Sequence, residues 1–260
     1  MEVLQEEDPR FSAIGRLYGA AGWARIRSAH VAVVGIGGVG SWTAEALART
    51  GVGRLTLIDM DEVCLTNTNR QIHALTGTVG RAKVDAMADR VRLIHPGCEV
   101  RPVATFFTPR TADALLEPRF DCVIDAFDHP RNKALLISRC RAAGVGMVTV
   151  GGAGGRKNPA AVTRGDLTES IQDGLLRRVR KLLRREHGFG NGPWGIPAVF
   201  SAERGEGPEA CEIDEDLPQD APPASLRIDC ATGYGTAAFV TGTFGFIAAA
   251  AAIDLLLGAP

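Results

Sequence analysis

The sequence lacks the cysteine spacings of a structural zinc site. Its six cysteines occur singly, with no Cys-x-x-Cys pair, so we do not expect a zinc ribbon. The first residues carry no apolar secretory segment, and we therefore expect reduced thiols and a cytoplasmic protein. Cys122 and Cys140 lie in apolar stretches and are expected in the core, whereas Cys211 and Cys230 are interpreted as incidental thiols, with reactivity left open.

The chain also lacks any large excess of one charge. It carries 29 basic and 30 acidic residues, for a net charge of −1, so nucleic-acid binding would require a local basic patch. No internal repeat is visible. Apolar residues make up 45% of the 260 positions and charged residues 23%, which is typical of a globular protein of one large or two small domains.

What the sequence does contain is a glycine-rich stretch between two apolar runs. The first run, residues 31–34, leads into Gly35, Gly37, Gly38 and Gly40 and then into a helical pattern. The second run ends in Asp59. This order predicts a strand, a phosphate-binding turn, a helix and a second strand whose terminal acid contacts a ribose. A purely structural glycine turn is the alternative, and the motif alone does not distinguish NAD from ATP.

The residues that follow favour ATP. Arg70 and Lys83 are cations that could hold the β- and γ-phosphates, while Asn67 and Asn69 could supply amide contacts. A dehydrogenase would not need such a cationic pair. Lys83 is expected near the start of a helix, where its charge opposes the helix dipole, and this local cost favours a functional role. Asp128, after a later strand, is placed to coordinate the Mg²⁺ that accompanies ATP.

Strand and helix patterns alternate along the chain, which predicts an α/β fold: a Rossmann-like, doubly wound, largely parallel sheet. The expected strands after Asp59 are residues 100–106, 120–127 and 146–150, with a possible strand at 161–163. The expected helices are residues 80–95, a short one from Thr108, and 130–143. Before the first strand, residues 11–29 show two short helical patterns, with Ile14, Leu17, Tyr18, Trp23 and Ile26 on their apolar faces.

The carboxyl-terminal part differs in character. Residues 168–187 are predicted to form a helix with a cationic run, for which we favour a nucleic-acid surface over an ordinary solvated face; the run comprises Arg177, Arg178, Arg180, Lys181, Arg184 and Arg185. Residues 202–225 are acidic, proline-rich and expected to be mobile. Residues 233–258 are apolar or small, and we favour a helix buried against the sheet or in a dimer interface over membrane contact.

Several motifs together resemble a known superfamily. The segments GIGGVGSW, LIDMDEV, NTNRQ, GRAK and DAFDHPRNK resemble the adenylating domain of the ubiquitin-activating superfamily, which includes the bacterial activators of molybdopterin and thiamine sulfur carriers. This match covers residues 10–165, and residues 166–260 would be a carboxyl-terminal extension of the same compact unit. Five further segments resemble the tRNA threonylcarbamoyladenosine dehydratase branch over nearly the whole chain: RLYG, NTNRQIHAL, VTVGGAGG, VFSAE and DCATGYG.

The resemblance implies an activity. A dehydratase of this branch uses ATP to adenylate the carboxylate of threonylcarbamoyladenosine in the tRNA anticodon loop, and the side chain then closes into a ring with net loss of water. By motif, Asp59 would hold the ribose, Asn67, Arg70 and Lys83 the phosphates, and Asp128 the Mg²⁺. Arg16 would reach the site of the partner subunit in a homodimer. His129 stands where sulfur-carrier activators often have asparagine.

Two other classes of function stay open at this point. The chain could activate a small ubiquitin-like sulfur-carrier protein, or it could be a non-catalytic nucleotide-binding or redox protein. The two cations Arg70 and Lys83 argue against the non-catalytic class. The sequence does not decide whether a monovalent cation orders the site or whether a sulfur-transfer protein docks.

Overall fold

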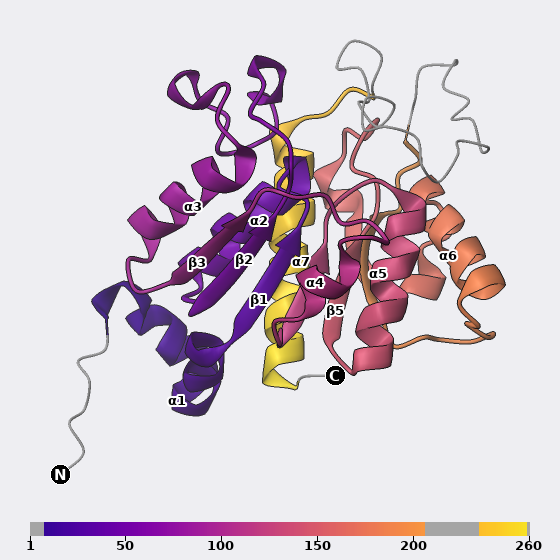
Figure 1. Ribbon diagram of the computed structural model, residues 1–260, viewed down its shortest axis with the longest axis horizontal. Helices are drawn as coiled ribbons and strands as arrows, with labels where there is room; N and C mark the ends of the chain where they lie inside the picture. The colour runs from indigo at the N-terminus through magenta and orange to yellow at the C-terminus, as the bar shows by residue number, and fades with distance from the viewer. Residues whose placement is uncertain (1–7, 206–233, 259–260) are drawn as a thin grey trace.

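The computed structural model describes residues 8–205 and 234–258, and Figure 1 shows how their elements are arranged. Their strands form one seven-stranded sheet in the order β3-β2-β1-β4-β5-β7-β6. All neighbours pair in parallel except β6 and β7, which are antiparallel. The strands are β1 (His30–Val34), β2 (Arg54–Ile58), β3 (Glu99–Val103), β4 (Cys122–Asp125), β5 (Gly146–Val150), β6 (Val162–Asp166) and β7 (Pro197–Ser201). The predicted Rossmann-like, largely parallel α/β fold is confirmed.

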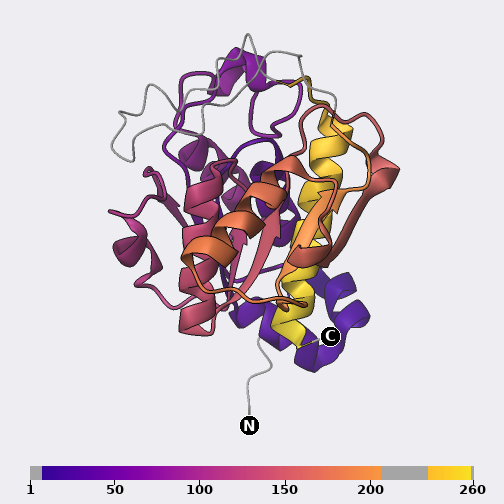
Figure 2. The ribbon, with the colours of Figure 1, turned by 90° about the vertical axis from the view of Figure 1, so that its right-hand side faces the viewer.

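Helices cover both faces of this sheet, as Figures 1 and 2 show. They are α1 (Ser12–Ser28), α2 (Gly38–Arg49), α3 (Lys83–Ile94), α4 (Ala112–Leu116), α5 (Pro130–Ala143), α6 (Gly174–Glu186) and α7 (Ala238–Leu257). Alternate residues of β1 separate two cores: Val31 and Val33 pack with residues of α2, α3 and α7, whereas Ala32 and Val34 pack with α5 and α6. Both faces of the sheet are therefore buried, as the apolar strand runs require.

Element boundaries follow the sequence closely where strong start and stop signals exist. Both α5 and β5 have the bounds predicted for them. Pro130 is the first residue of α5, and Gly144, with a φ of 67°, ends it in the left-handed region that glycine favours. The helix predicted from Thr108 instead begins at Ala112, because the side chain of Thr111 bonds locally to Thr108 and to the carbonyl of Phe106.

Two other sequence predictions need correction. The basic helix does not begin at 168: residues 167–169 form a 3-10 turn, and α6 starts after Asp173, whose carboxylate caps it. The strand β7 was not predicted, although its residues were part of a recognised motif. It lies between β5 and β6, so residues predicted as a carboxyl-terminal extension complete the sheet.

The apolar carboxyl-terminal stretch forms α7, which runs along the sheet face beside α2 (Figure 1). Its 20 residues are long and apolar enough to cross a membrane, but 56% of its most apolar window is buried inside the protein, as in a core helix. Gly245 shows how close the packing is. A Cβ there would lie 2.7 Å from Cβ of Trp42 and 2.8 Å from the carbonyl oxygen of Val39, both in α2. The predicted burial of this helix against the sheet is confirmed.

The amino-terminal segment forms α1, which contains a kink at Gly19, where φ is +71°. The two predicted helical patterns therefore meet at this glycine. Trp23 and Ile26 are buried within the subunit, whereas Leu17, predicted on an apolar face that packs outside the sheet or against a partner, is 71% exposed. Phe11 anchors the start of the segment, with its ring 5.6 Å from Trp23 and 4.5 Å from His95.

The cysteines are free thiols wherever the structure describes them. Cys122 and Cys140 are buried, which confirms their prediction as core residues, and burial raises the pKa of both thiols. Cys64 is exposed. The predictions for Cys211, Cys230 and most of the acidic segment 202–225 lie outside the described residues.

Candidate nucleotide-binding site

The glycine-rich turn joins β1 to α2 at the carboxyl ends of the parallel strands. A Cβ on Gly35 would lie 2.9 Å from the backbone of Ala126, and one on Gly40 would lie 1.7 Å from the carbonyl oxygen of Gly35. Only glycine permits this close approach of turn, helix and β4. At Gly37, by contrast, a Cβ would meet no atom within 4 Å. The turn is therefore packed on its inner side and open on its outer side.

The open side coincides with the start of α2. Gly37 is the N-cap residue, and no side chain caps the helix. The first N–H groups of a helix have no partner within it and are usually satisfied by a side chain, water or a ligand. Together with the helix dipole, these donors make an anion site. The turn thus has the free backbone donors and the open space that phosphates need.

Asp59 lies beside this turn, directly after β2. Its Oδ2 accepts a hydrogen bond from the Ile36 N–H (2.6 Å), and its Oδ1 accepts one from the Asp61 N–H (2.8 Å). Burial raises the pKa of Asp59, and the nearby Lys83 opposes that shift. A carboxylate oxygen can accept more than one hydrogen bond, so the oriented group retains capacity for ribose hydroxyls.

Arg70 extends over the glycine turn from the segment between β2 and α3. A Cβ on Gly38 would lie 3.6 Å from Cδ of Arg70, which places this side chain against the start of α2. Its guanidinium donates to the carbonyl oxygen of Thr66 (2.7 Å) and to Oδ1 of Asn69 (3.0 Å). Its own carbonyl oxygen accepts from Nε1 of Trp42 (3.0 Å) and from the Thr241 hydroxyl (3.2 Å). These bonds tie the segment to α2 and α7.

The two asparagines of this segment have different settings. Asn67 is buried, and its Oδ1 accepts from the backbone N–H of Cys64 (3.0 Å), so it stabilises the local 3-10 turn. Asn69 is exposed, and its Nδ2 donates to the carbonyl oxygen of Thr236 (2.9 Å). Asn69 therefore links the segment to the residues that precede α7.

Lys83 is the first residue of α3, as its predicted place near a helix start requires. Its side chain is only 9% exposed, and Nζ lies 2.8 Å from Oδ2 of Asp61, which is 53% exposed. Lys83 also acts electrostatically on Asp59 and Asp128. The start of α3 and the ends of β2 and β4 therefore bring one cation and two carboxylates together. A buried ammonium with one exposed carboxylate as partner can exchange that partner for a phosphate.

Asp128 follows β4, the strand next to β1, at the point where the strand order reverses. The Asp128 side chain is exposed to solvent on one side. Desolvation by the surrounding protein nevertheless raises its pKa, and the positive charges of Lys133, Arg70 and Lys83 oppose this shift. Asp128 therefore lies within electrostatic range of both predicted phosphate-binding cations. The next residue, His129, caps α5 by accepting the Asn132 N–H at Nδ1, and burial lowers its pKa.

Beneath Asp128 lies an ion pair that sequence reasoning missed. Lys133 Nζ lies 2.6 Å from Oδ1 of Asp125, and both side chains are fully buried. The Thr149 hydroxyl donates to Oδ2 of Asp125 (2.9 Å). The spacing of eight residues from Asp125, at the end of an apolar strand, to the only lysine of the following helix was the available sequence signal. The pair fixes the end of β4 to α5 and β5.

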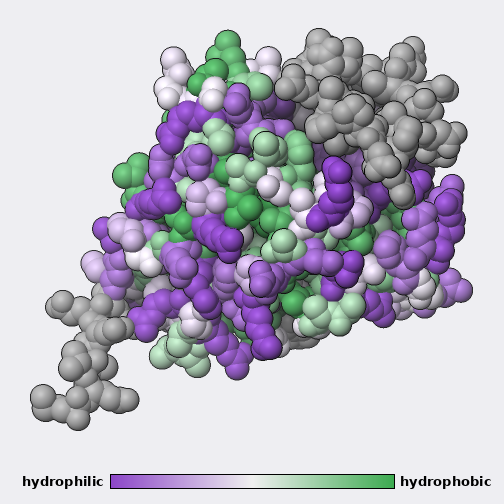
Figure 3. Space-filling view, viewed as in Figure 1, coloured by the Kyte–Doolittle hydropathy of each residue, from purple (hydrophilic) through white to green (hydrophobic). Residues whose placement is uncertain are grey.

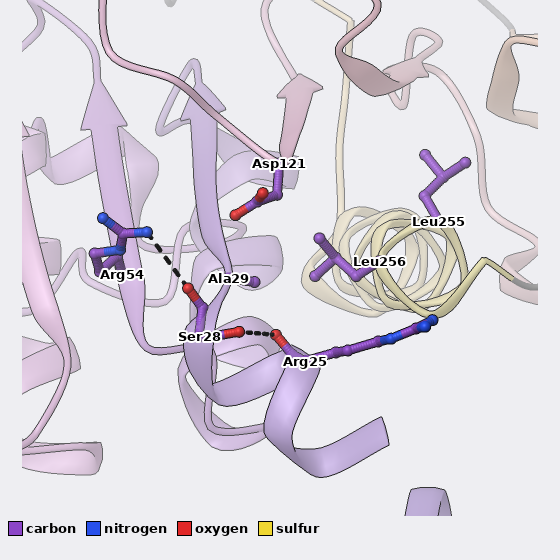
Figure 4. A pocket seen from close by; sticks show the side chains of 7 residues that line it. All are labelled: Arg25, Ser28, Ala29, Arg54, Asp121, Leu255 and Leu256. Atoms are coloured by element: carbon purple, nitrogen blue, oxygen red, sulfur yellow. Dashed lines mark hydrogen bonds between the residues drawn. The ribbon is translucent and has the colours of Figure 1, made fainter. Parts of the chain in front are cut away.

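Two features lie away from this edge. Arg16 is exposed on α1, which Figure 1 shows at the opposite end of the sheet from the glycine turn, so the residue does not reach the site of its own subunit. A cavity of about 350 Å³ lies at the amino ends of the strands (Figure 4) and is remote from the site; it is lined by Arg25, Ser28, Ala29, Arg54, Asp121, Leu255 and Leu256.

The cationic run on α6 divides between surface and interior. Arg180 is buried, and its guanidinium donates to the carbonyl oxygen of Ser170 (2.7 Å), so its assignment to a nucleic-acid surface is wrong. Five cations are exposed and share one face at the helical spacing: Arg177, Arg178, Lys181, Arg184 and Arg185. Figure 2 shows α6 on the outside of the molecule, and the edge it occupies in Figure 3 is largely hydrophilic.

The sequence pattern of the ThiF family matches residues 12–260, so the chain belongs to the ThiF family. The predicted resemblance to the adenylating superfamily is thereby confirmed. Among curated proteins, the chain is 43% identical to the tRNA threonylcarbamoyladenosine dehydratase of Haemophilus influenzae, covering 99% of this chain and 97% of that protein. It is 45% identical to the Escherichia coli enzyme of the same name, covering 95% and 93%.

A solved structure is equally similar. The crystal structure of the E. coli tRNA N6-threonylcarbamoyladenosine dehydratase in complex with ATP has a TM-score of 0.82 and 42% identity to this chain. The match covers 96% of this chain and 94% of that one. The predicted likeness to the dehydratase branch is confirmed over nearly the full length of both chains.

Proposed function

We propose that this protein is an ATP-dependent enzyme that dehydrates threonylcarbamoyladenosine in tRNA to its cyclic form. The observation that carries the proposal is the convergence of an uncapped helix start, Asp59 and two cations, Arg70 and Lys83, at one edge of the sheet. This convergence occurs in a chain whose relatives named as dehydratases match it over nearly its whole length.

The first chemical step is adenylation. The carboxylate of the substrate side chain attacks the α-phosphorus of ATP, an acyl–O–P bond forms, and the bond to pyrophosphate breaks. The start of α2 and Asp59 bind the phosphates and the ribose, while Arg70 and Lys83 stabilise the charge that develops on the departing pyrophosphate. Lys83 exchanges Asp61 for the nucleotide. Asn67 holds the turn from which Arg70 extends, and Asn69 connects it to residue 236.

The second step is intramolecular. The carbamoyl group of the same side chain attacks the activated acyl carbon and loses a proton to solvent, AMP leaves, and a ring closes. Because nucleophile and electrophile belong to one substituent, proximity replaces a nucleophile of the enzyme. Over both steps the base loses one water, and ATP becomes AMP and pyrophosphate.

A magnesium ion fits this arrangement through Asp128. Among residues 8–205 and 234–258 no group of three metal-ligating side chains occurs. Mg²⁺ is commonly held by one or two carboxylates together with nucleotide phosphates and water, so an isolated carboxylate near the phosphate cations suits it. When bound, the ion would neutralise phosphate charge. A monovalent cation and a sulfur-transfer protein stay open as further components, and the reaction on tRNA implies a cytoplasmic enzyme.

To test the function, the purified protein is incubated with ATP, Mg²⁺ and threonylcarbamoylated tRNA, and the digested nucleosides are weighed. We expect the modified adenosine to lose the mass of one water, together with release of AMP and pyrophosphate. The sulfur-carrier alternative predicts ATP–pyrophosphate exchange only when a small protein ending in Gly-Gly is added. An unchanged nucleoside together with such exchange would show that the protein is a sulfur-carrier activator and not a dehydratase.

The exposed face of α6 is proposed as the tRNA surface. Arg177, Arg178 and Lys181 are exposed and have no acidic partner among the described residues, so their simultaneous change to alanine removes three cations without breaking an ion pair. We expect tRNA affinity to fall about 10- to 100-fold near 100 mM salt, and the slope of log K against log salt to become shallower by roughly two to three. Affinity for ATP should stay unchanged.

Filter binding across a salt series measures this effect. Arg92→Ala serves as the matched control, because Arg92 is an exposed cation on α3 that pairs with Asp89. It should leave both affinity and slope unaltered. Wild-type affinity in the triple variant would mean that α6 does not contact the RNA.

Arg16 is proposed to act in the active site of the partner subunit of a homodimer. Its position on α1, far from the glycine turn, supports action in trans. We expect Arg16→Ala and Lys83→Ala each to be inactive, and their mixture to regain activity in mixed dimers, up to about one quarter of wild type by random pairing. Turnover is measured after subunit exchange. A mixture that stays inactive, while native mass spectrometry confirms that mixed dimers have formed, would exclude action in trans.

A further inference from the structure

One buried carboxylate joins the basic helix to the candidate active-site edge. Asp173 is the N-cap residue of α6 and is 1% exposed. Its Oδ1 accepts the Leu176 N–H (2.9 Å), whereas its Oδ2 accepts the Gly152 N–H (3.0 Å) and lies 3.1 Å from the Arg156 guanidinium. A single side chain therefore caps the helix with one oxygen and holds the loop after β5 with the other.

The loop held in this way, residues 151–155, belongs to the candidate site. It leaves β5 at the same edge at which β4 delivers Asp128, since these strands are parallel neighbours. A Cβ on Gly151 would lie 2.3 Å from Oδ2 of Asp173, so the glycine allows the backbone to rest on this carboxylate. The charge of Asp173 also acts on Asp128 and helps raise its pKa.

Backbone hydrogen bonds hold the two ends of the loop, from the Gly151 N–H to the carbonyl oxygen of Val199 (2.8 Å) and from the Gly155 N–H to that of Gly235 (2.8 Å). Arg156, which is 6% exposed, uses its remaining contacts on the carbonyl oxygen of Glu203 (3.2 Å) and on the ring of Phe244, 5.8 Å from its centroid. These contacts connect the loop to the end of β7 and to α7. Asp173 is the group that connects it to α6. Moving α6 relative to the loop would leave the Arg156 charge buried and unpaired, which is strongly unfavourable.

We propose that Asp173 is a positioning residue that fixes the RNA-binding face of α6 relative to loop 151–155, so that tRNA bound on α6 presents its modified base to the adenylating site. This inference rests on the proposed function. Asp173 does not touch the substrate. Its role is to place the modified base of a bound tRNA at the adenylating site. Loss of Asp173 therefore lowers kcat and leaves KM for tRNA nearly unchanged.

The test is Asp173→Ser in the full-length protein. Serine still caps a helix, but its shorter side chain does not reach Gly152 and Arg156. We expect kcat for tRNA dehydration to fall about 10- to 100-fold, while KM for tRNA and affinity for ATP stay within threefold. The double variant Asp173→Ser with Arg156→Leu removes the unpaired charge. It should regain thermal stability without regaining kcat, which separates positioning from folding.

Asp166→Ser is the matched control. Asp166 likewise caps a helical turn, by accepting the Thr168 N–H, and accepts backbone N–H groups of a second segment at Trp194 and Ile196, but it lies at the other end of the sheet. It should lose stability while kcat per folded molecule stays at the wild-type level.

The outcomes of these measurements confirm or overturn the positioning role of Asp173. Full kcat in Asp173→Ser, or recovery of kcat with stability in the double variant, overturns the proposal. So does a rise in KM with unchanged kcat, because Asp173 would then only support RNA binding. If the wild-type protein leaves the tRNA nucleoside unchanged, the proposed function itself has failed.

Discussion

Changing Lys83 to alanine is expected to lower the rate of adenylation by at least ~100-fold, since removing one preorganised donor from a charge-stabilising site typically costs 100- to 1,000-fold. The Lys83 side chain is nearly buried, its Nζ pairs with the exposed Asp61 and with no other carboxylate in the part of the chain that the structure describes, and its charge acts on both Asp59 and Asp128. Arg70→Ala should have a similar effect, because the Arg70 side chain lies over the start of α2. Pyrophosphate release with saturating tRNA and ATP measures both variants.

A control of the same charge lies close by. Arg81, two residues before Lys83, is exposed and pairs with Asp89 at 2.6 Å. Arg81→Ala should retain full activity, since an exposed ion pair contributes little. All three variants should melt within a few degrees of wild type. Full turnover in either Lys83→Ala or Arg70→Ala would show that the phosphates bind elsewhere.

The largest expected effect on stability comes from Lys133→Met. This change removes the cation that pairs with the fully buried Asp125, and an uncompensated buried charge costs about 3–5 kcal/mol. Adding Asp125→Asn removes the charge and keeps an oxygen for the Thr149 hydroxyl, so the double variant should recover most of the loss. Chemical denaturation at pH 7 measures the free energy of unfolding of each variant.

The pH dependence supplies a second check. Burial raises the pKa of Asp125 above its ordinary value, and loss of Lys133 raises it further. A carboxyl group with a raised folded pKa binds more protons in the folded state, so stability increases as pH falls. The deficit of Lys133→Met should therefore shrink between pH 7 and pH 5. A deficit that is constant with pH would mean that lost packing, not the unpaired charge, causes the destabilisation.

The sequence predicted the features that local chemistry determines. The glycine turn, the acid after β2 and the bounds of α5 each follow from residues adjacent in the chain. Lys83 at the start of α3 was predicted for the same reason.

Features that depend on contacts between distant segments were not predictable in this way. Arg180 belongs to the cationic run in sequence, yet at the helical spacing it faces the interior, where backbone carbonyls satisfy it. Leu17 belongs to the apolar pattern of its helix, but its side chain is exposed on the subunit surface. The strand β7 follows a glycine- and proline-containing stretch and pairs only with segments distant in sequence. Its five residues show no alternation of polar and apolar side chains, which is the usual sequence signal of a strand.

The position of α7 has a consequence for biosynthesis. This last helix of the described chain supports α2, the helix that carries the phosphate-binding turn, and covers one face of the central strands. Until the ribosome has released these residues, that face of the nascent sheet lacks its cover and exposes valine and leucine side chains to water. The amino-terminal half therefore reaches its final packing, and the nucleotide pocket its final shape, only after α7 has been synthesised and has docked on α2.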